Sequence, residues 1–113
     1  MKANNLLKDI EYHDTRPAIK VMLNTDFTKE IRILMRENHE MKEHKTPFPI
    51  VIQIIEGRID FGVNGKRHDL SKGSIVALPG GVPHDLIAKE QSMIRLTLNK
   101  FDAEDRVSKV LDL

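Results

Sequence analysis

Histidine is the residue type in this sequence with the widest chemistry, because imidazole titrates near neutral pH and is the commonest metal ligand. The chain has five histidines and no cysteine. His84 follows a Pro-Gly-Gly turn in GSIVALPGGVPHDLIA (73–88), and His44 opens the segment HKTPFPI. His13 and His68 stand apart from any cluster and are expected to be solvated. The sequence therefore singles out His44 and His84.

The turn before His84 allows two interpretations. Pro79 pre-sets a turn, and Gly80 and Gly81 can adopt backbone angles closed to other residues. The chain could then re-enter a barrel with His84 facing inward. A polar histidine beside a turn could equally point at water, which is the commoner situation for histidine.

The composition of the chain argues against several classes of protein. A chain of 113 residues makes one domain with a single core. Its 18 basic and 17 acidic residues are interspersed and give a net charge of +1, so nucleic acid and anionic membrane are not expected partners. Without cysteine there is no disulfide, thiolate nucleophile or thiolate metal site. No signal-peptide core or apolar stretch of ~18 residues is present, which predicts a soluble, cytoplasmic protein.

From residue 18 onward, short apolar stretches alternate with turn residues, the pattern of an all-β sandwich or barrel. In KEIRILMRE (29–37), Ile31, Ile33 and Met35 fall on one face and Arg32 on the other. Asn64-Gly65 is typical of a two-residue hairpin turn. The hairpin-length links favour antiparallel pairing. Eight strands are predicted, in these segments: AIKVML, KEIRILMRE, IVIQII, RIDFGV, KRHDL, SIVAL, VPHDLIA and SMIRLTL.

The two ends of the chain are less regular. The segment NNLLKDIEY could form a helical turn, or an edge strand that reaches a second subunit. Residues 1–20 are accordingly predicted to be an arm exchanged in a homodimer, since pairing would cover open strand edges. In the tail, residues 102–113, Val107, Val110 and Leu111 have helical spacing and predict a short helix.

The spacing of Gly73, Pro79, Gly81 and His84 resembles the second motif of the cupin superfamily. His44, followed after twelve residues by Gly57, is similar to the first cupin motif in overall span. The resemblance covers residues of about 38–98 and implies a single cupin domain over residues 1–113. It implies a jelly-roll barrel (a double-stranded β-helix, RmlC-like) that is usually dimeric and encloses a pocket. It also favours the inward-facing interpretation of His84.

The first motif is degenerate. Metal-binding cupins supply a second histidine and a glutamate from this motif, and the resemblance places Thr46 and Ile50 at those positions. Two of four ligands are thus lost, which leaves His44 and His84 as an incomplete metal site. Typical sites of this kind need three or four protein ligands. Other side chains of suitable type lie at the wrong strand parity or too far along the chain: His39, Glu40, Glu43 and Gln53.

Gln53 is the one polar residue in an otherwise apolar strand. Its amide could be solvated or could bond across a dimer interface, since a buried amide requires a partner. Arg95 could bind a carboxylate or phosphate if it faced inward, although an exposed charge on the barrel wall is the commoner situation. The candidate pocket residues are His44, Thr46, Phe48, Ile50, Ile52, His84 and Arg95.

Three functions fit these residues. A barrel lined by aliphatic side chains, with two histidines and a threonine at one end, predicts binding or sensing of a small molecule, with no cofactor or a weakly bound divalent transition metal. The alternative is a metal-dependent cupin enzyme of the dioxygenase or isomerase type, with His44 and His84 as ligands. Metal-free acid–base catalysis would need a carboxylate to orient a histidine. Adjacent Asp85 should face the other way, and the sequence leaves open whether there is catalysis.

Overall fold

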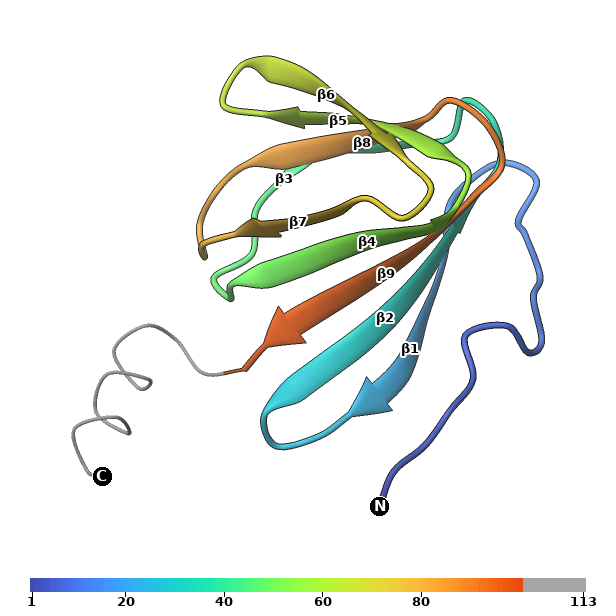
Figure 1. Ribbon diagram of the computed structural model, residues 1–113, viewed down its shortest axis with the longest axis vertical. Coiled ribbons are helices and arrows are strands. Elements are labelled where there is room, and N and C mark those ends of the chain that lie inside the picture. The colour runs from blue at the N-terminus through green and yellow to red at the C-terminus, as the bar shows by residue number, and fades with distance from the viewer. Residues whose placement is uncertain (101–113) are drawn as a thin grey trace.

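Nine β-strands follow one another in the computed structural model, which describes residues 1–100 (Figure 1). Eight of them correspond to the predicted segments. The strands are β1 (Ala18–Asn24), β2 (Thr28–Met35), β3 (Glu40–His44), β4 (Ile50–Glu56), β5 (Arg58–Val63), β6 (Lys66–Ser71), β7 (Ile75–Leu78), β8 (His84–Ala88) and β9 (Ser92–Asn99).

The strands form two antiparallel sheets that face each other (Figure 1). The large sheet has the order β1-β2-β9-β4-β7, and the small sheet has the order β3-β8-β5-β6. Non-sequential neighbours in both sheets give the jelly-roll topology, so the all-β prediction is confirmed. The core between the sheets is built mainly from isoleucine and leucine side chains with one aromatic ring, Phe61.

Local patterns explain most of these elements. In β2, Ile31, Ile33 and Met35 are buried in the core, as their alternation predicts. Between β5 and β6, Asn64 has φ 53° and Gly65 has φ 73°, the positive angles that a type I′ hairpin turn requires. The hairpin fixes the register of β5 against β6, with Val63 opposite Lys66.

Strand β3 was missed by the sequence prediction. Its sequence, EMKEH, contains one apolar residue and has no alternation of apolar and polar side chains. Four of its five residues are exposed, because β3 lies at the edge of the small sheet and pairs only with β8. The strand is therefore specified by its pairing partner, which a local pattern cannot reveal.

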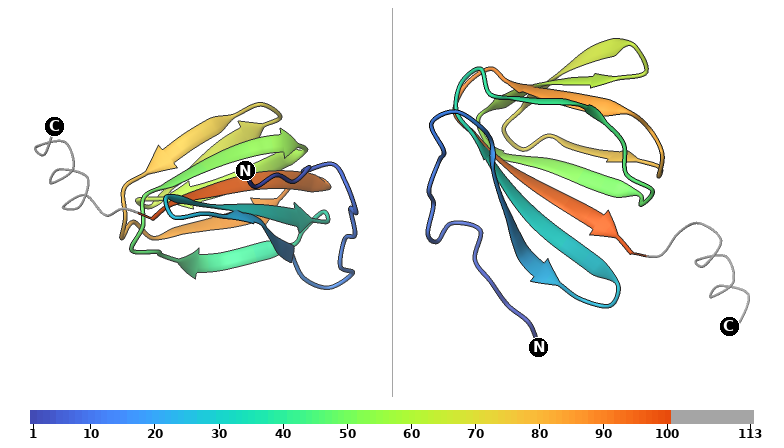
Figure 2. Two further views of the ribbon diagram at one scale, coloured as in Figure 1. Left: turned by 90° about the horizontal axis from the view of Figure 1, so that it is seen from below. Right: turned by 180° about the vertical axis from the view of Figure 1, so that it is seen from behind.

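Residues before β1 lie along the outer face of the large sheet (Figure 2). The structure corrects both alternatives for the N-terminal segment, a helical turn and an edge strand: residues 1–17 form a turn near Leu6 and then an extended arm. The arm is held by Arg32 of β2, whose guanidinium donates hydrogen bonds to the carbonyl oxygens of Leu6, Lys8 and Asp9 at 2.9, 2.7 and 3.0 Å. Arg32, on the polar face of its strand, is thereby 2% exposed.

The predicted C-terminal helix lies outside the described residues. Among residues 1–100, no helix is long and apolar enough to cross a membrane.

Candidate functional site

One end of the barrel is framed by three connections between strands: loop 45–49, loop 79–83 and the β5–β6 hairpin (Figure 1). We call this end the mouth. Loop 45–49 leads from the small sheet to the large sheet, and loop 79–83 leads back. His44 is the last residue of β3 and His84 is the first residue of β8, so each histidine stands where a loop meets the mouth.

The two loops contact each other directly. The backbone N–H of Gly81 donates to the carbonyl oxygen of Thr46 at 2.7 Å. Gly81 has φ 81°, whereas no positive φ occurs at Gly80, which corrects the expectation that both glycines need special backbone angles. Gly80 is required for a different reason, because a Cβ there would overlap the carbonyl group of Pro47. These contacts fix loop 79–83 against loop 45–49.

The structure brings the two predicted histidines together. His44 and His84 are directly opposite in the register of β3 and β8. Their ring centroids are 4.5 Å apart, with 61° between the ring planes. His84 is only 3% exposed and also contacts the ring of Phe61, at a centroid distance of 5.9 Å. His44 is exposed, so the pair extends from solvent into the barrel.

Backbone contacts define the protonation of both rings. The Nδ1 atom of His44 lies 2.7 Å from the carbonyl oxygen of Lys42, and Nδ1 of His84 lies 2.9 Å from that of Val82. A carbonyl oxygen can only accept a hydrogen bond, so each Nδ1 carries the proton. In the neutral ring, Nε2 is then an acceptor with a free lone pair. The mouth thus presents two imidazole acceptors.

The acceptor of His84 is open to solvent although the residue is buried. No hydrogen bond is formed by Nε2 of His84 among residues 1–100. Within that part of the chain, the one fully buried side-chain nitrogen or oxygen without a partner is Nε of Arg32. It follows that Nε2 of His84 borders space that water can enter.

Apolar side chains surround the histidines. Val63 of β5 lies directly opposite His84. In the large sheet, Ile50 pairs with Leu78 and Leu98 at the same end of the barrel. Val63, Leu78 and Leu98 are packed against the core yet only partly buried, as expected for the inner wall of an open mouth.

The other predicted pocket residues are placed as follows. Ile50 and Ile52 are buried in the core of the large sheet. Thr46 and Phe48 lie in loop 45–49 and are half-buried. The hydroxyl oxygen of Thr46 accepts a hydrogen bond from the backbone N–H of Phe48 at 3.2 Å, so this side chain orders its own loop.

Arg95 is not brought to the histidines. It lies on the outer face of the large sheet, where its guanidinium donates to the carboxylate of Glu30 at 3.0 Å. Together with residues of the arm it borders a cavity of about 370 Å³. Gln53 is opposite Arg95 in the register of β4 and β9, and therefore faces outward as well.

The residues at the mouth do not fit the four-ligand site of metal-binding cupins. Within residues 1–100, no group of three or more His, Cys, Asp or Glu side chains is placed to hold a metal ion. The buried side chain of Ile50 is a hydrocarbon. His39, a possible replacement, instead contacts the backbone of Arg36 and Asp14.

Arg67, Asp60 and Asp85 of the small sheet lie on its other face. Arg67 contacts Asp85 at 2.8 Å and Asp60 at 3.0 Å. Next to them, the hydrogen-bonded guanidinium of Arg58 lowers the pKa of the Asp69 carboxyl group. Asp85 is thus engaged by Arg67, and the groups that orient His44 and His84 are backbone carbonyls.

Sequence reasoning missed two residues of the mouth, Phe61 and Val63. The alternation in RIDFGV would have found them, since Ile59, Phe61 and Val63 share one face of that strand. The carbonyl groups that fix the imidazole protons have no signal in the sequence, because any residue could supply them.

Comparisons with known proteins identify a family and a fold that agree with each other. The model of the AraC-like ligand-binding domain family matches residues 29–108. No curated protein matches the sequence. Solved structures resemble the chain in fold at low sequence identity.

Three of these structures illustrate the likeness. An RmlC-like cupin protein from Desulfovibrio desulfuricans has a TM-score of 0.80 at 20% identity, covering 88% of this chain and 96% of its own. An RmlC-like cupin from Shewanella frigidimarina has a TM-score of 0.76 at 16% identity, covering 91% and 93%. KdgF from Halomonas sp. has a TM-score of 0.75 at 15% identity, covering 92% and 99%. The chain therefore belongs to the AraC-like ligand-binding domain family, and its fold is that of a small cupin.

Proposed function

We propose that this protein binds a small molecule at the mouth, and that the molecule has an apolar body and a hydroxyl or ammonium group. The observation that carries the proposal is the open Nε2 of His84, an acceptor without a partner among residues 1–100, on a residue that is 3% exposed. This atom borders space that water can enter, so a bound molecule that reaches the mouth can donate a hydrogen bond to it.

The direction of the two histidine hydrogen bonds determines which polar group the ligand can carry. Because both Nδ1 atoms donate to carbonyl oxygens, both Nε2 atoms accept. The ligand must therefore donate, as a hydroxyl or ammonium group does and a carboxylate cannot. Because the ring centroids are 4.5 Å apart, a ligand that donates to one imidazole also lies close to the other.

The apolar side chains at the mouth favour a ligand with an apolar body. Val63, Leu78 and Leu98 are aliphatic and partly exposed at the mouth. Covering them removes apolar surface from water, at roughly 25 cal/mol per Å². Ligand sites of this kind combine apolar walls with a few placed polar groups.

Three probes with one apolar body and different head groups test the proposal: benzyl alcohol, benzylamine and benzoate. At mildly alkaline pH, where imidazole is neutral, we expect benzyl alcohol and benzylamine to shift the ring ¹⁵N resonances of His44 and His84. Benzoate, which can only accept, should leave them unchanged. The resonances of the exposed His13 in the N-terminal arm serve as the control within the same spectra.

Two outcomes would contradict the proposal. If benzoate binds at the mouth as tightly as benzyl alcohol, the rule that the ligand donates is wrong. If none of the probes shifts His84 while stoichiometric zinc does, the two acceptors serve a metal ion. A hydrogen bond from Nδ1 to a carbonyl is also the usual arrangement of metal-bound histidine, so zinc is titrated in addition to the three organic probes.

A further inference from the structure

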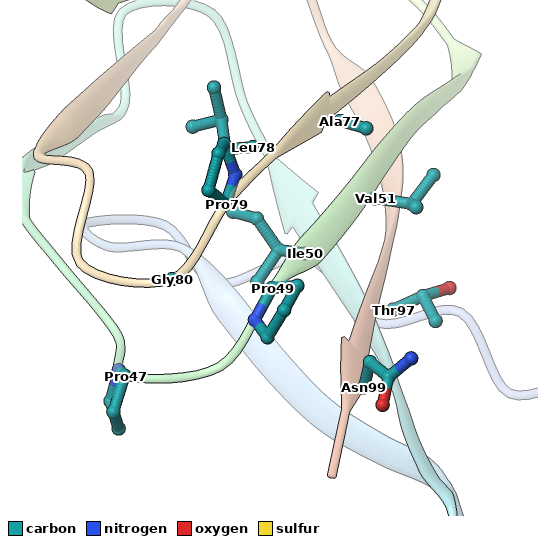
Figure 3. A pocket seen from close by; sticks show the side chains of 10 residues that line it. All are labelled: Pro47, Pro49, Ile50, Val51, Ala77, Leu78, Pro79, Gly80, Thr97 and Asn99. Carbon is teal, nitrogen blue, oxygen red and sulfur yellow. The ribbon is translucent and has the colours of Figure 1, made fainter. Parts of the chain in front are cut away.

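The large sheet borders two hollows of different chemistry. One is a groove of about 670 Å³ at β4, β7 and β9, with prolines of loops 45–49 and 79–83 at its end (Figure 3). None of its ten lining residues is charged. The other has a volume of about 370 Å³ and lies where the N-terminal arm meets β1, β2 and β9. We call it the arm cavity, and its lining residues are Asn4, Asn5, Leu6, Met22, Leu23, Glu30 and Arg95.

Part of the wall of the arm cavity is apolar. Leu6 comes from the arm, and Met22 and Leu23 come from β1. Met22 is buried, and the two leucines are half-buried. The side-chain amide of Asn4 donates a hydrogen bond to the carbonyl oxygen of Met22 at 3.1 Å, and so holds the arm against β1. The cavity is therefore formed by the folded arm together with the sheet.

The polar part of the wall has hydrogen-bond donors to spare. Glu30 is 8% exposed, and both of its carboxylate oxygens are engaged, one by the guanidinium of Arg95 at 3.0 Å and the other by the hydroxyl of Thr97. A guanidinium has five N–H groups. Arg95 uses one of them for Glu30, and the other four form no hydrogen bond within residues 1–100. The unused capacity at this cavity thus belongs to a cation.

A second arginine adds positive charge beside Arg95. Arg32 lies directly opposite Arg95 in the register of β2 and β9. Like charges placed directly opposite in a sheet are destabilising. In the described part of the chain, Glu30 is the one carboxylate that forms an ion pair with either guanidinium. Asp9 and Glu11 border Arg32 at a separate cavity, and neither is paired with it. A bound anion would offset this excess of positive charge.

We propose that the arm cavity is a second ligand site, outside the barrel, for a small carboxylate with an apolar body. A carboxylate accepts two parallel N–H bonds from one guanidinium, here that of Arg95. Leu6, Met22 and Leu23 then cover its hydrocarbon part. The volume of about 370 Å³ falls within the roughly 300–1,000 Å³ of small-molecule sites. The ligand chemistry is opposite to that proposed for the mouth, where the ligand must donate, so the two sites can be tested separately.

Titration of the full-length chain with benzoate tests this, followed in ¹H–¹⁵N spectra of the backbone and of the arginine side chains. Benzoate should shift the amide resonances of Leu6 and Leu23 and the Nε resonance of Arg95. It should leave the imidazole resonances of His44 and His84 unchanged. Benzylamine has the same ring and a positive head group, so it should leave the arm cavity resonances unchanged.

Replacing Arg95 with glutamine should raise the dissociation constant for benzoate roughly ten- to a hundredfold, the range expected for loss of a charged hydrogen-bond donor. Arg58→Gln is the matched control. Arg58 also pairs with a single carboxylate, that of Asp69, and its side chain is 52% exposed against 42% for Arg95. This variant should bind benzoate like the wild type.

Thermal melts check that the variants fold, because Arg95→Gln leaves Glu30 without its ion pair. If that variant is unfolded, the double variant Glu30→Gln/Arg95→Gln decides, since it removes both charges of the pair. It should show the same loss of benzoate binding. The proposal is overturned if folded protein without Arg95 binds benzoate as tightly as Arg58→Gln does. It is equally overturned if benzoate shifts no resonance of the arm cavity, or shifts only Val51 and Ala77 of the uncharged groove (Figure 3).

Discussion

Replacing His84 with phenylalanine is expected to weaken binding of benzyl alcohol roughly 5- to 150-fold. The ring remains in its place beside Phe61, but the acceptor is lost and the ligand hydroxyl can no longer donate to the imidazole of His84. That penalty is about 1–3 kcal/mol, and about 1.4 kcal/mol corresponds to a tenfold change in the dissociation constant. Titration calorimetry or NMR titration measures the effect.

Two further variants separate the lost acceptor from altered packing. His84→Gln restores an acceptor oxygen and should recover part of the affinity. His13→Phe changes an exposed histidine of the N-terminal arm and should have no effect. The account of the site is wrong if His84→Phe binds benzyl alcohol as tightly as the wild type while remaining folded.

The Gly57→Ala variant is expected to lose about 2–5 kcal/mol of unfolding free energy. Gly57 connects β4 to β5, where the chain passes from the large sheet to the small sheet, and its φ is 89°. A side chain at such a φ costs roughly 1–2 kcal/mol. The added Cβ would also overlap Ser92 Oγ and the carbonyl oxygen of Gln91, and would lie 2.7 Å from Ser92 Cα. Overpacking of this kind costs roughly 1–3 kcal/mol more.

Gly65→Ala is the matched control for this prediction. Gly65 has a similar φ of 73°, but nothing lies within 4 Å of the position of its Cβ. It should therefore show the backbone penalty alone. Denaturant unfolding of the two variants measures the difference, and equal losses would show that the contact with Ser92 is unimportant. Ser92 is fully buried and its hydroxyl accepts from the N–H of Arg58 at 3.0 Å, so the site has little room to adjust.

Local patterns in the sequence were sufficient for most of the fold. Eight strands, the Asn64-Gly65 turn and the inward face of β2 each follow from alternation or turn chemistry within a few residues. Burial of Arg32 could not be predicted, because the arm that covers it is some 25 residues away and has no periodic pattern. Strand β3 was missed for the same kind of reason, since its pairing with β8 alone specifies it.

The sequence indicated the two histidines of the candidate site but not their chemistry, nor Phe61 and Val63 beside them. The spacing of His44 and His84 indicated two related positions, and the structure places the rings 4.5 Å apart. Which nitrogen carries the proton depends on the carbonyl groups of Lys42 and Val82, which no side-chain pattern reveals. Alternation along β9 predicts only that Arg95 and its neighbour Ile94 face opposite sides of the sheet. The fold was needed to show that Ile94 is the buried residue and that Arg95 is on the outer face.

Long-range ¹H–¹⁵N correlation spectra of the imidazole rings show whether His44 and His84 present two Nε2 acceptors at the mouth. The spectra are recorded at mildly alkaline pH with and without benzyl alcohol. We expect both rings to carry their proton on Nδ1, and the Nε2 resonance of His84 to shift when the alcohol is added. A spectrum in which His84 is protonated on Nε2, or in which its Nε2 is indifferent to the alcohol, would contradict this expectation.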